Sequence, residues 1–194
     1  MGRHTSIAIR MALVTMAVLG ILYPLVMTGL AQLLFPKQAN GSLLRVNGRV
    51  IGSELIGQQF TGLNYFHSRP SAAGKGYDAV SSGGSNLGPT SKVLLKAVGE
   101  RSKSVRLQNP GVDAGQIPVD MVTASGSGLD PDISIANAYA QLPRVASARR
   151  LPAERVKQLV YDNTTQRLFG FLGEPRVNVL QINRALDDIG KRAK

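Results

Sequence analysis

The sequence has no cysteine and no tryptophan, and only two histidines, His4 and His67, among 194 residues. Without cysteine, the chain forms neither disulfides nor a thiolate metal site. With two histidines, it lacks the nitrogen ligands that a zinc or iron site needs. We therefore expect a fold held together by its apolar core, with no metal and no cofactor of its own.

Acidic residues are also scarce: 12 Asp and Glu stand against 23 Lys and Arg, for a net charge of +11. Such an excess favours nucleic acid, an anionic membrane surface or an acidic protein as the partner. Few aromatic residues and no zinc-finger or RNP pattern argue against nucleic acid. Basic residues gather in 144–194, where a solvated face is the first interpretation and contact with lipid head groups or a partner is the second.

Motifs of nucleophilic and phosphate chemistry are missing as well. No serine lies in a G-x-S-x-G or Ser-x-x-Lys pattern, and a catalytic triad in the large domain has only His67 available. Gly83 and Gly88 have the spacing of a P-loop, but Pro89 stands where its lysine belongs. These absences indicate a binding or assembly module rather than an enzyme.

Two aspartates are the remaining candidates for acid–base chemistry. Asp130 and Asp132 flank Pro131, so their carboxylates are close in the sequence. A helix cap followed by acidity in the first turn explains the same pattern more simply, because both groups complement the positive end of a helix dipole. We expect the cap.

The longest apolar run lies near the N-terminus, where residues 11–36 contain no charged side chain. About 20 helical residues cross a hydrocarbon core. We expect a short leader at 1–10, a transmembrane helix at 11–35 and one domain at 36–194. A cleavable signal peptide is the alternative, because Gly29-Leu30-Ala31 has small residues at the right offsets, but the run exceeds a signal core.

Within this span, Pro24 removes a helical hydrogen bond and should kink the helix. We expect Gly20, Pro24, Thr28 and Gly29 to pack against other membrane helices. Charge decides the orientation poorly, because Lys37, Arg45 and Arg49 balance the leader. A short leader before a large domain favours a cytoplasmic N-terminus and an extracytoplasmic domain.

The domain is expected to be of the α+β class. Asn47-Gly48 predicts a two-residue hairpin within 42–51, and Ser91 caps a helix to about residue 108. Tyr65 and Phe66 are interpreted as core anchors rather than a stacking platform. Further patterns predict a strand at 119–124, helices at 130–150 and 152–166, with Pro143 interrupting or bending the first, and a helix at 175–189.

Two glycine- and serine-rich stretches, 80–91 and 122–131, are the most distinctive part of the domain. Glycines permit a close approach of another chain, and such loops present backbone N–H groups. They form a cradle for an anion, a carbonyl or a partner, or else are ordinary surface loops. The candidate residues are Ser82, Gly83, Gly84, Ser85, Asn86, Gly88, Pro89, Ser125, Gly126, Ser127, Gly128 and Asp130.

Five segments occur in a fixed order behind the span: GSELIGQQF, YFHSRPSA, SSGGSNLGPTS, VTASGSGLDPDIS and EPRVNVLQINRALD. This series resembles the C subunit of the bacterial Kdp-type potassium-transporting ATPase. The resemblance implies an inner-membrane complex of four subunits that imports potassium at the expense of ATP. Its partners would be a P-type ATPase subunit, a channel-like potassium-binding subunit and a small membrane subunit, together with membrane lipid.

By the same resemblance this chain is a non-catalytic subunit that holds the assembly together. ATP and Mg are then used by the ATPase subunit and K⁺ is the transported ion, in keeping with the absence here of D-K-T-G and T-V-G-Y-G sequences. The family's C subunit is also described as a catalytic chaperone that raises ATP affinity. The L-S-G-G-Q signature invoked for this corresponds here only to 81–85, where Ser85 replaces the glutamine.

If the domain lies outside the membrane, these glycines do not touch cytoplasmic ATP. An effect of this subunit on ATP affinity would then pass through the membrane helix. This placement also suggests that the neutral loop 80–89 docks on the channel-like subunit while basic helices face lipid or solvent. The alternative from another class is a membrane-anchored extracytoplasmic module for ligand binding or signalling.

Overall fold

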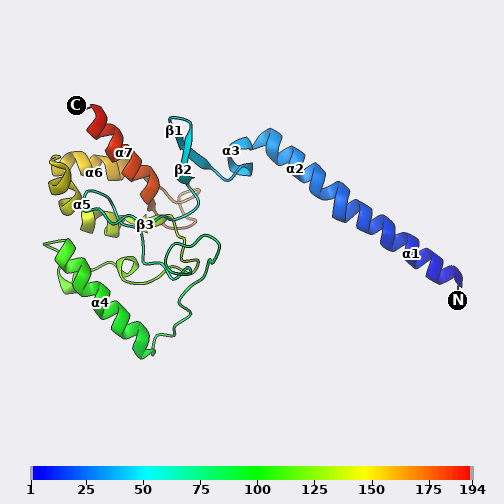
Figure 1. Ribbon diagram of the computed structural model, residues 1–194, viewed down its shortest axis with the longest axis horizontal. Coiled ribbons are helices and arrows are strands. Elements are labelled where there is room, and N and C mark those ends of the chain that lie inside the picture. The colour runs from blue at the N-terminus through cyan, green and yellow to red at the C-terminus, as the bar shows by residue number, and fades with distance from the viewer. Residues whose placement is uncertain (1, 193–194) are drawn as a thin grey trace. The chain divides into compact units, whose positions relative to one another are not determined.

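The computed structural model describes residues 2–192, and the chain divides into two compact units, Met1–Ile51 and Gly52–Lys194 (Figure 1). The first unit is a long helix followed by a short helix and a hairpin. The second is a mixed α/β unit with a small sheet, as the α+β prediction requires. We describe each unit by itself.

The N-terminal helix runs without a break from Gly2 to Leu34, so the residues expected as a leader are helical too. Its 33 residues rise about 50 Å at 1.5 Å per residue, which exceeds a hydrocarbon core. None of these residues is buried, and their apolar side chains face outward all round. Among the described residues, this is the one helix long and apolar enough to cross a membrane.

Pro24 changes the helix locally. The helix consists of α1 (Gly2–Ala17), a π-helical turn (Val18–Leu22) and α2 (Tyr23–Leu34). The N–H of Tyr23 donates to the Val18 carbonyl, five residues back, so the wider turn comes just before the proline that has no N–H to give. A π turn is one of the recognised sources of bending in a helix.

The hairpin follows the short helix α3 (Pro36–Ala39) and consists of β1 (Leu43–Val46) and β2 (Arg49–Ser53). Asn47 and Gly48 have φ angles of 50° and 79°, as a type I′ turn requires. The prediction of this turn from Asn-Gly is therefore confirmed.

The second unit packs helices on a three-stranded antiparallel sheet in the order β3-β5-β4. In β5, Val177 pairs with Ile133 of β3 on one side and with Thr164 of β4 on the other. The elements are α4 (Lys92–Gln108), 3₁₀ turns at Ala114–Gln116 and Val119–Met121, β3 (Asp132–Ser134), α5 (Ile135–Arg149), α6 (Ala153–Asp162), β4 (Thr164–Thr165), β5 (Arg176–Asn178) and α7 (Val179–Arg192).

The core lies where α5, α6 and α7 meet the sheet and the segment around Phe66, which is fully buried (Figure 1). Its other members are apolar side chains at helical or strand spacing: Ile133, Ala138, Leu142, Val145, Ala146, Val156, Val160, Val177, Val179, Ile182 and Leu186. Helix α4 contributes none of its residues to this core and stands apart from the other helices (Figure 1). Its start is as predicted, since the Ser91 side chain accepts from Leu94 N.

Four predicted boundaries are wrong, and pairing between distant segments explains most of them. Residues 132–134 form β3 rather than the first turn of a helix, because they pair with 176–178. The same pairing moves the start of the last helix from 175 to Val179. Helix α6 ends at Asp162, not at about 166, because Thr164 and Thr165 join β5. Residues 119–121 form a 3₁₀ turn instead of a strand, because Met121 N donates back to Pro118 O.

Helix α5 continues through Pro143, so of the two expected effects, interruption or bending, the interruption does not occur. The proline and the residue four positions earlier, Tyr139, both lie on the exposed side of the helix. Solvent can therefore hydrate the carbonyl that the proline leaves without a helical donor.

Candidate functional site

The two glycine- and serine-rich loops contact each other. Gly83 N and Ser82 Oγ both donate to the Ser127 carbonyl, at 2.9 and 3.0 Å. Gly84 lies against Gly126, where a Cβ on Gly84 would come 2.9 Å from the Gly126 carbonyl oxygen. Loops predicted separately from the sequence thus form one surface.

Gly128 is the most restricted glycine of the pair. Its φ is +67°, and a Cβ there would lie 2.6 Å from both Ala73 N and Gly83 O. Ser71 Oγ donates to the Gly128 carbonyl at 2.6 Å and accepts from Tyr77 N at 2.8 Å. A third segment, 71–77, therefore fixes the two loops, and no sequence argument had assigned it this role.

Apart from Asp130, the candidate residues fall into two groups. Six of them hold the loops or are buried beneath them: Ser82, Gly83, Gly84, Ser125, Ser127 and Gly128. Ser82 and Ser127 are exposed as well, and so are the five others: Ser85, Asn86, Gly88, Pro89 and Gly126. Together with Leu87 and Thr90 these five give an uncharged surface just before α4, which we call the neutral loop surface (85–90 and 126).

Asp130 does not cap a helix. Its carboxylate accepts from Arg69 Nη1 at 2.9 Å and from Asp132 N at 3.1 Å. Asp132 pairs instead with Arg176 Nε at 2.8 Å. The two aspartates are therefore separate ion pairs, and the cap of α5 is Ser134, whose Oγ accepts from Asn137 N. The cap interpretation is wrong because Asp130 precedes a strand.

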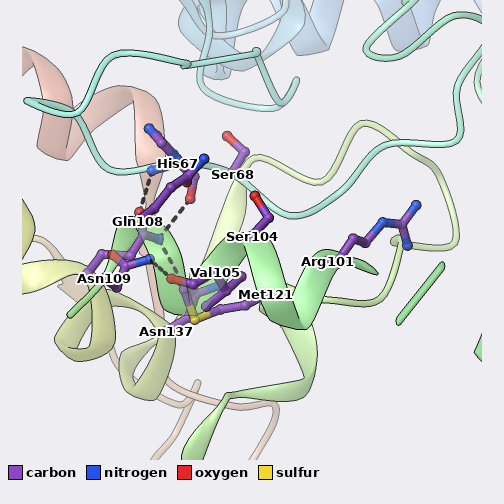
Figure 2. Close-up of a pocket in the computed structure, with 10 residues that line it drawn as sticks. His67, Ser68, Arg101, Ser104, Val105, Gln108, Asn109, Met121 and Asn137 are labelled. Carbon is purple, nitrogen blue, oxygen red and sulfur yellow. Dashed lines mark hydrogen bonds between the residues drawn. The ribbon is translucent and has the colours of Figure 1, made fainter. Parts of the chain in front are cut away.

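A second polar region surrounds a cavity of about 160 Å³ between α4, α5 and the segment at His67 (Figure 2). Figure 2 shows the Arg101 side chain pointing away from the other labelled residues. The buried amides of Asn109, Asn137 and Gln141 line its inner wall. Sequence analysis missed these side chains.

Arg144 lies behind this wall and is only 6% exposed. Its guanidinium donates to four neutral acceptors: Leu63 O at 2.6 Å, Tyr65 O at 2.9 Å, Asn109 Oδ1 at 3.0 Å and Gln141 Oε1 at 2.5 Å. Burial lowers the pKa of Arg144 to about 10, so the guanidinium stays charged at neutral pH.

His67 is neutral in this setting. Burial lowers its pKa, and the nearby charge of Arg144 lowers it further. Its Nε2 lies 3.0 Å from the Gly62 carbonyl, which can only accept, so Nε2 carries the hydrogen. Ser68 donates its hydroxyl to Gln58 O at 2.9 Å and is not a nucleophile activated by His67. The hydrogen bonds of His67 and Ser68 therefore hold the neighbouring backbone, and the two side chains do not form a serine–histidine catalytic pair.

The buried polar side chains on α5 have a sequence signal. Asn137, Gln141 and Arg144 recur every three or four residues, on the face that also carries Leu142 and Val145. Polar residues in a buried helical stripe must find partners, so this spacing predicts a buried network. Within the described residues, no three His, Cys, Asp or Glu side chains gather as a metal site.

Comparison with known protein families matches residues 5–188 to the family described as "K+-transporting ATPase, c chain". The chain belongs to this family. Members similar to it carry the name "Potassium-transporting ATPase KdpC subunit". That of Acidobacterium capsulatum is 57% identical over 96% of this chain and 98% of its own. That of Gemmatimonas aurantiaca is 57% identical, over 97% of this chain and 94% of its own length.

A less similar relative matches the same share of the chain. The subunit of that name from Mycobacterium tuberculosis is 54% identical over 96% of this chain and 99% of its own. The family assignment therefore covers both the N-terminal helix and the α/β unit, and it confirms the resemblance carried by the five segments.

Proposed function

We propose that this family member is the non-catalytic C subunit of an ATP-driven potassium import complex, which it helps to assemble. Its partners are a P-type ATPase subunit, a channel-like potassium subunit and a small membrane subunit. ATP and Mg serve the ATPase subunit, and K⁺ is the transported ion. The observation that carries the proposal is the family match over residues 5–188, shared with relatives named as potassium-transporting ATPase subunits.

The membrane arrangement is part of the proposal. The Gly2–Leu34 helix crosses the inner membrane with its N-terminus in the cytoplasm, and Gly20, Pro24, Thr28 and Gly29 pack against partner helices. The α/β unit is then periplasmic. The exposed small residues suit close contact between membrane helices.

The neutral loop surface is the proposed docking site on the channel-like subunit. It is exposed and carries no charge, and the residues just before it, Ser82 and Gly83, bond to the Ser127 carbonyl. A neutral contact near a cation entrance avoids the repulsion that the chain's net charge of +11 would cause.

Direct contact of 81–85 with ATP is not part of the proposal. The Gly83 N–H, which a phosphate would need, already donates to Ser127, and Gly84 lies against Gly126. If the subunit raises ATP affinity as a catalytic chaperone, the effect passes through the membrane helix as a coupling between distant sites.

Gly88→Arg tests the docking site, because Gly88 is exposed and a Cβ there meets open space. The variant should fold normally, since nothing in the chain opposes the new side chain. It should no longer copurify with the channel-like subunit, and potassium uptake should be lost. Gly99→Arg is the matched control, because Gly99 is also exposed with open space but lies on α4. Normal copurification of Gly88→Arg would contradict the docking site.

A further inference from the structure

The turn between β4 and β5 ends in four exposed large apolar side chains. Leu168, Phe169, Phe171 and Leu172 are 62%, 79%, 70% and 48% exposed. No charged residue lies among 168–172, and Gly170 is at the centre. We call this segment the 168–172 tip.

The tip has a defined shape. Leu168 N donates to Leu172 O at 2.9 Å, and Leu172 N donates to Leu168 O at 3.0 Å, which closes a narrow hairpin. Phe169 and Gly170 have φ angles of 53° and 81°, as a tight turn requires. Below it, Arg167 pairs with Glu174 at 2.7 Å. The apolar side chains are therefore held outward and do not fold back on their own unit.

Basic side chains flank the tip on both strands. Arg167 and Arg176 are 44% and 51% exposed, and their ion pairs, to Glu174 and Asp132, each use one guanidinium nitrogen. A guanidinium has five N–H donors, so both arginines keep donors for a second acceptor. An apolar aromatic apex above arginines matches the boundary between acyl chains and anionic head groups.

The chain also keeps this unit near a bilayer. Only residues 35–51 separate the end of the membrane-crossing helix from Gly52, where the second unit begins. Even a fully extended segment of this length would reach only about 60 Å at roughly 3.5 Å per residue, and this one is shortened by α3 and the hairpin. A convex tip of this kind enters lipid without a preformed groove, whereas a protein partner would need a matching pocket.

We propose that the 168–172 tip inserts into the head-group region of the bilayer that the N-terminal helix crosses, with Arg167 and Arg176 bound to lipid phosphates. Phe169 and Phe171 then lie below the phosphates, and the α/β unit has a second point of attachment to the membrane. The contact requires no other subunit. It limits rotation of the unit about its tether and so orients the neutral loop surface.

A single tryptophan reports on the tip, because the natural chain has none. Full-length Phe171→Trp is placed in nanodiscs of phosphatidylethanolamine and phosphatidylglycerol that hold one chain each. Insertion to a depth of roughly 5–10 Å should shift its emission to the blue, and lipids brominated near the head-group end of the acyl chain should quench it strongly.

Leu107→Trp is the matched control, because Leu107 is an apolar side chain on α4 that is 83% exposed. Its emission should stay water-like and unquenched. The proposal would be overturned if Phe171→Trp and Phe169→Trp both gave water-like, unquenched emission. Unchanged circular dichroism of both variants would show that the chain is still folded. A blue shift without bromine quenching would overturn the proposal too, because protein rather than lipid would then cover the tip.

Discussion

Two buried amide side chains hold the backbone beside the core. Asn183 accepts from Phe66 N at 2.8 Å and donates to Phe66 O at 2.9 Å. Gln141 does the same for His67, at 2.7 and 3.0 Å. Each amide thus replaces the neighbouring strand that residues 66 and 67 lack. This explains how an irregular segment remains buried without unpaired backbone groups.

A third contact fixes the same segment from its exposed side. Arg149 donates to Asn64 O at 2.7 Å and to Asp187 at 2.8 Å, and its guanidinium lies 4.7 Å from the centre of the Tyr65 ring. Tyr65 also donates to Asp187. The interpretation as a core anchor is therefore confirmed for Phe66. It is wrong for Tyr65, which is half-buried and joins a polar cluster because its hydroxyl donates to Asp187.

His67 should make stability depend on pH. Its folded pKa lies below the ordinary 6.5, so the unfolded chain takes up a proton first as pH falls. The stability that neutral His67 contributes to the folded state is fully present above pH 6.5. It is lost as pH drops through that value toward the folded pKa. The free energy of unfolding, from denaturant titrations between about pH 7 and pH 5, should therefore fall with pH.

Substitution separates this effect from carboxylate titration. His67→Gln keeps an Nε2 donor for Gly62 O but cannot take up a proton, so its free energy of unfolding should fall less over the same range. His4→Gln, which replaces the chain's other histidine, should keep the wild-type slope. Equal slopes for His67→Gln and the wild type would show that His67 is not the group responsible.

At the scale of elements, local signals predicted some boundaries and failed at others. Asn47-Gly48 and Ser91 act on their nearest neighbours, so the hairpin and the start of α4 could be predicted from the sequence. Residues 132–134 could not, because their partner strand lies more than forty positions away. Apolar spacing does not tell a short buried strand from the first turn of a helix.

The start of α5 gives a prediction at this scale. Ser134 Oγ accepts from Asn137 N and donates to Asp120, both at 3.0 Å. Ser134→Ala should lower the free energy of unfolding by about 1 kcal/mol through loss of the cap. Denaturant titration of the full chain in detergent measures the change.

Ser91→Ala is the control for this prediction. The bond from Leu94 N to Ser91 is longer, at 3.4 Å, and α4 has no buried residues. Loss of its cap should fray α4 while changing global unfolding less. A larger loss for Ser91→Ala than for Ser134→Ala would mean that α4 contributes more to stability than its exposure indicates.

For the whole molecule, the candidate site could be predicted in its parts but not in its assembly. Composition identified 80–91 and 122–131 because glycine and serine stand out locally. The bond from Gly83 to Ser127 depends on how the chain folds between them, and so does the support from Ser71. Arg144 and its amides were missed because polar side chains in a helix are usually read as exposed.

As we propose them, the neutral loop surface and the 168–172 tip would give the α/β unit two different kinds of contact. The first is uncharged and made largely of backbone and small side chains, which suits a protein partner. The second is aromatic and leucine-rich with arginines beside it, which suits lipid. A subunit with both contacts would bind a partner subunit and the membrane surface at the same time.

The most direct test of this account is a mild-detergent pulldown of the tagged full-length chain from its native membrane, with bound proteins identified by mass. We predict recovery of a P-type ATPase subunit and a channel-like potassium subunit together with the chain. Recovery of the chain alone, under conditions that preserve other membrane complexes, would contradict the assembly role and favour an independent membrane-anchored binding module.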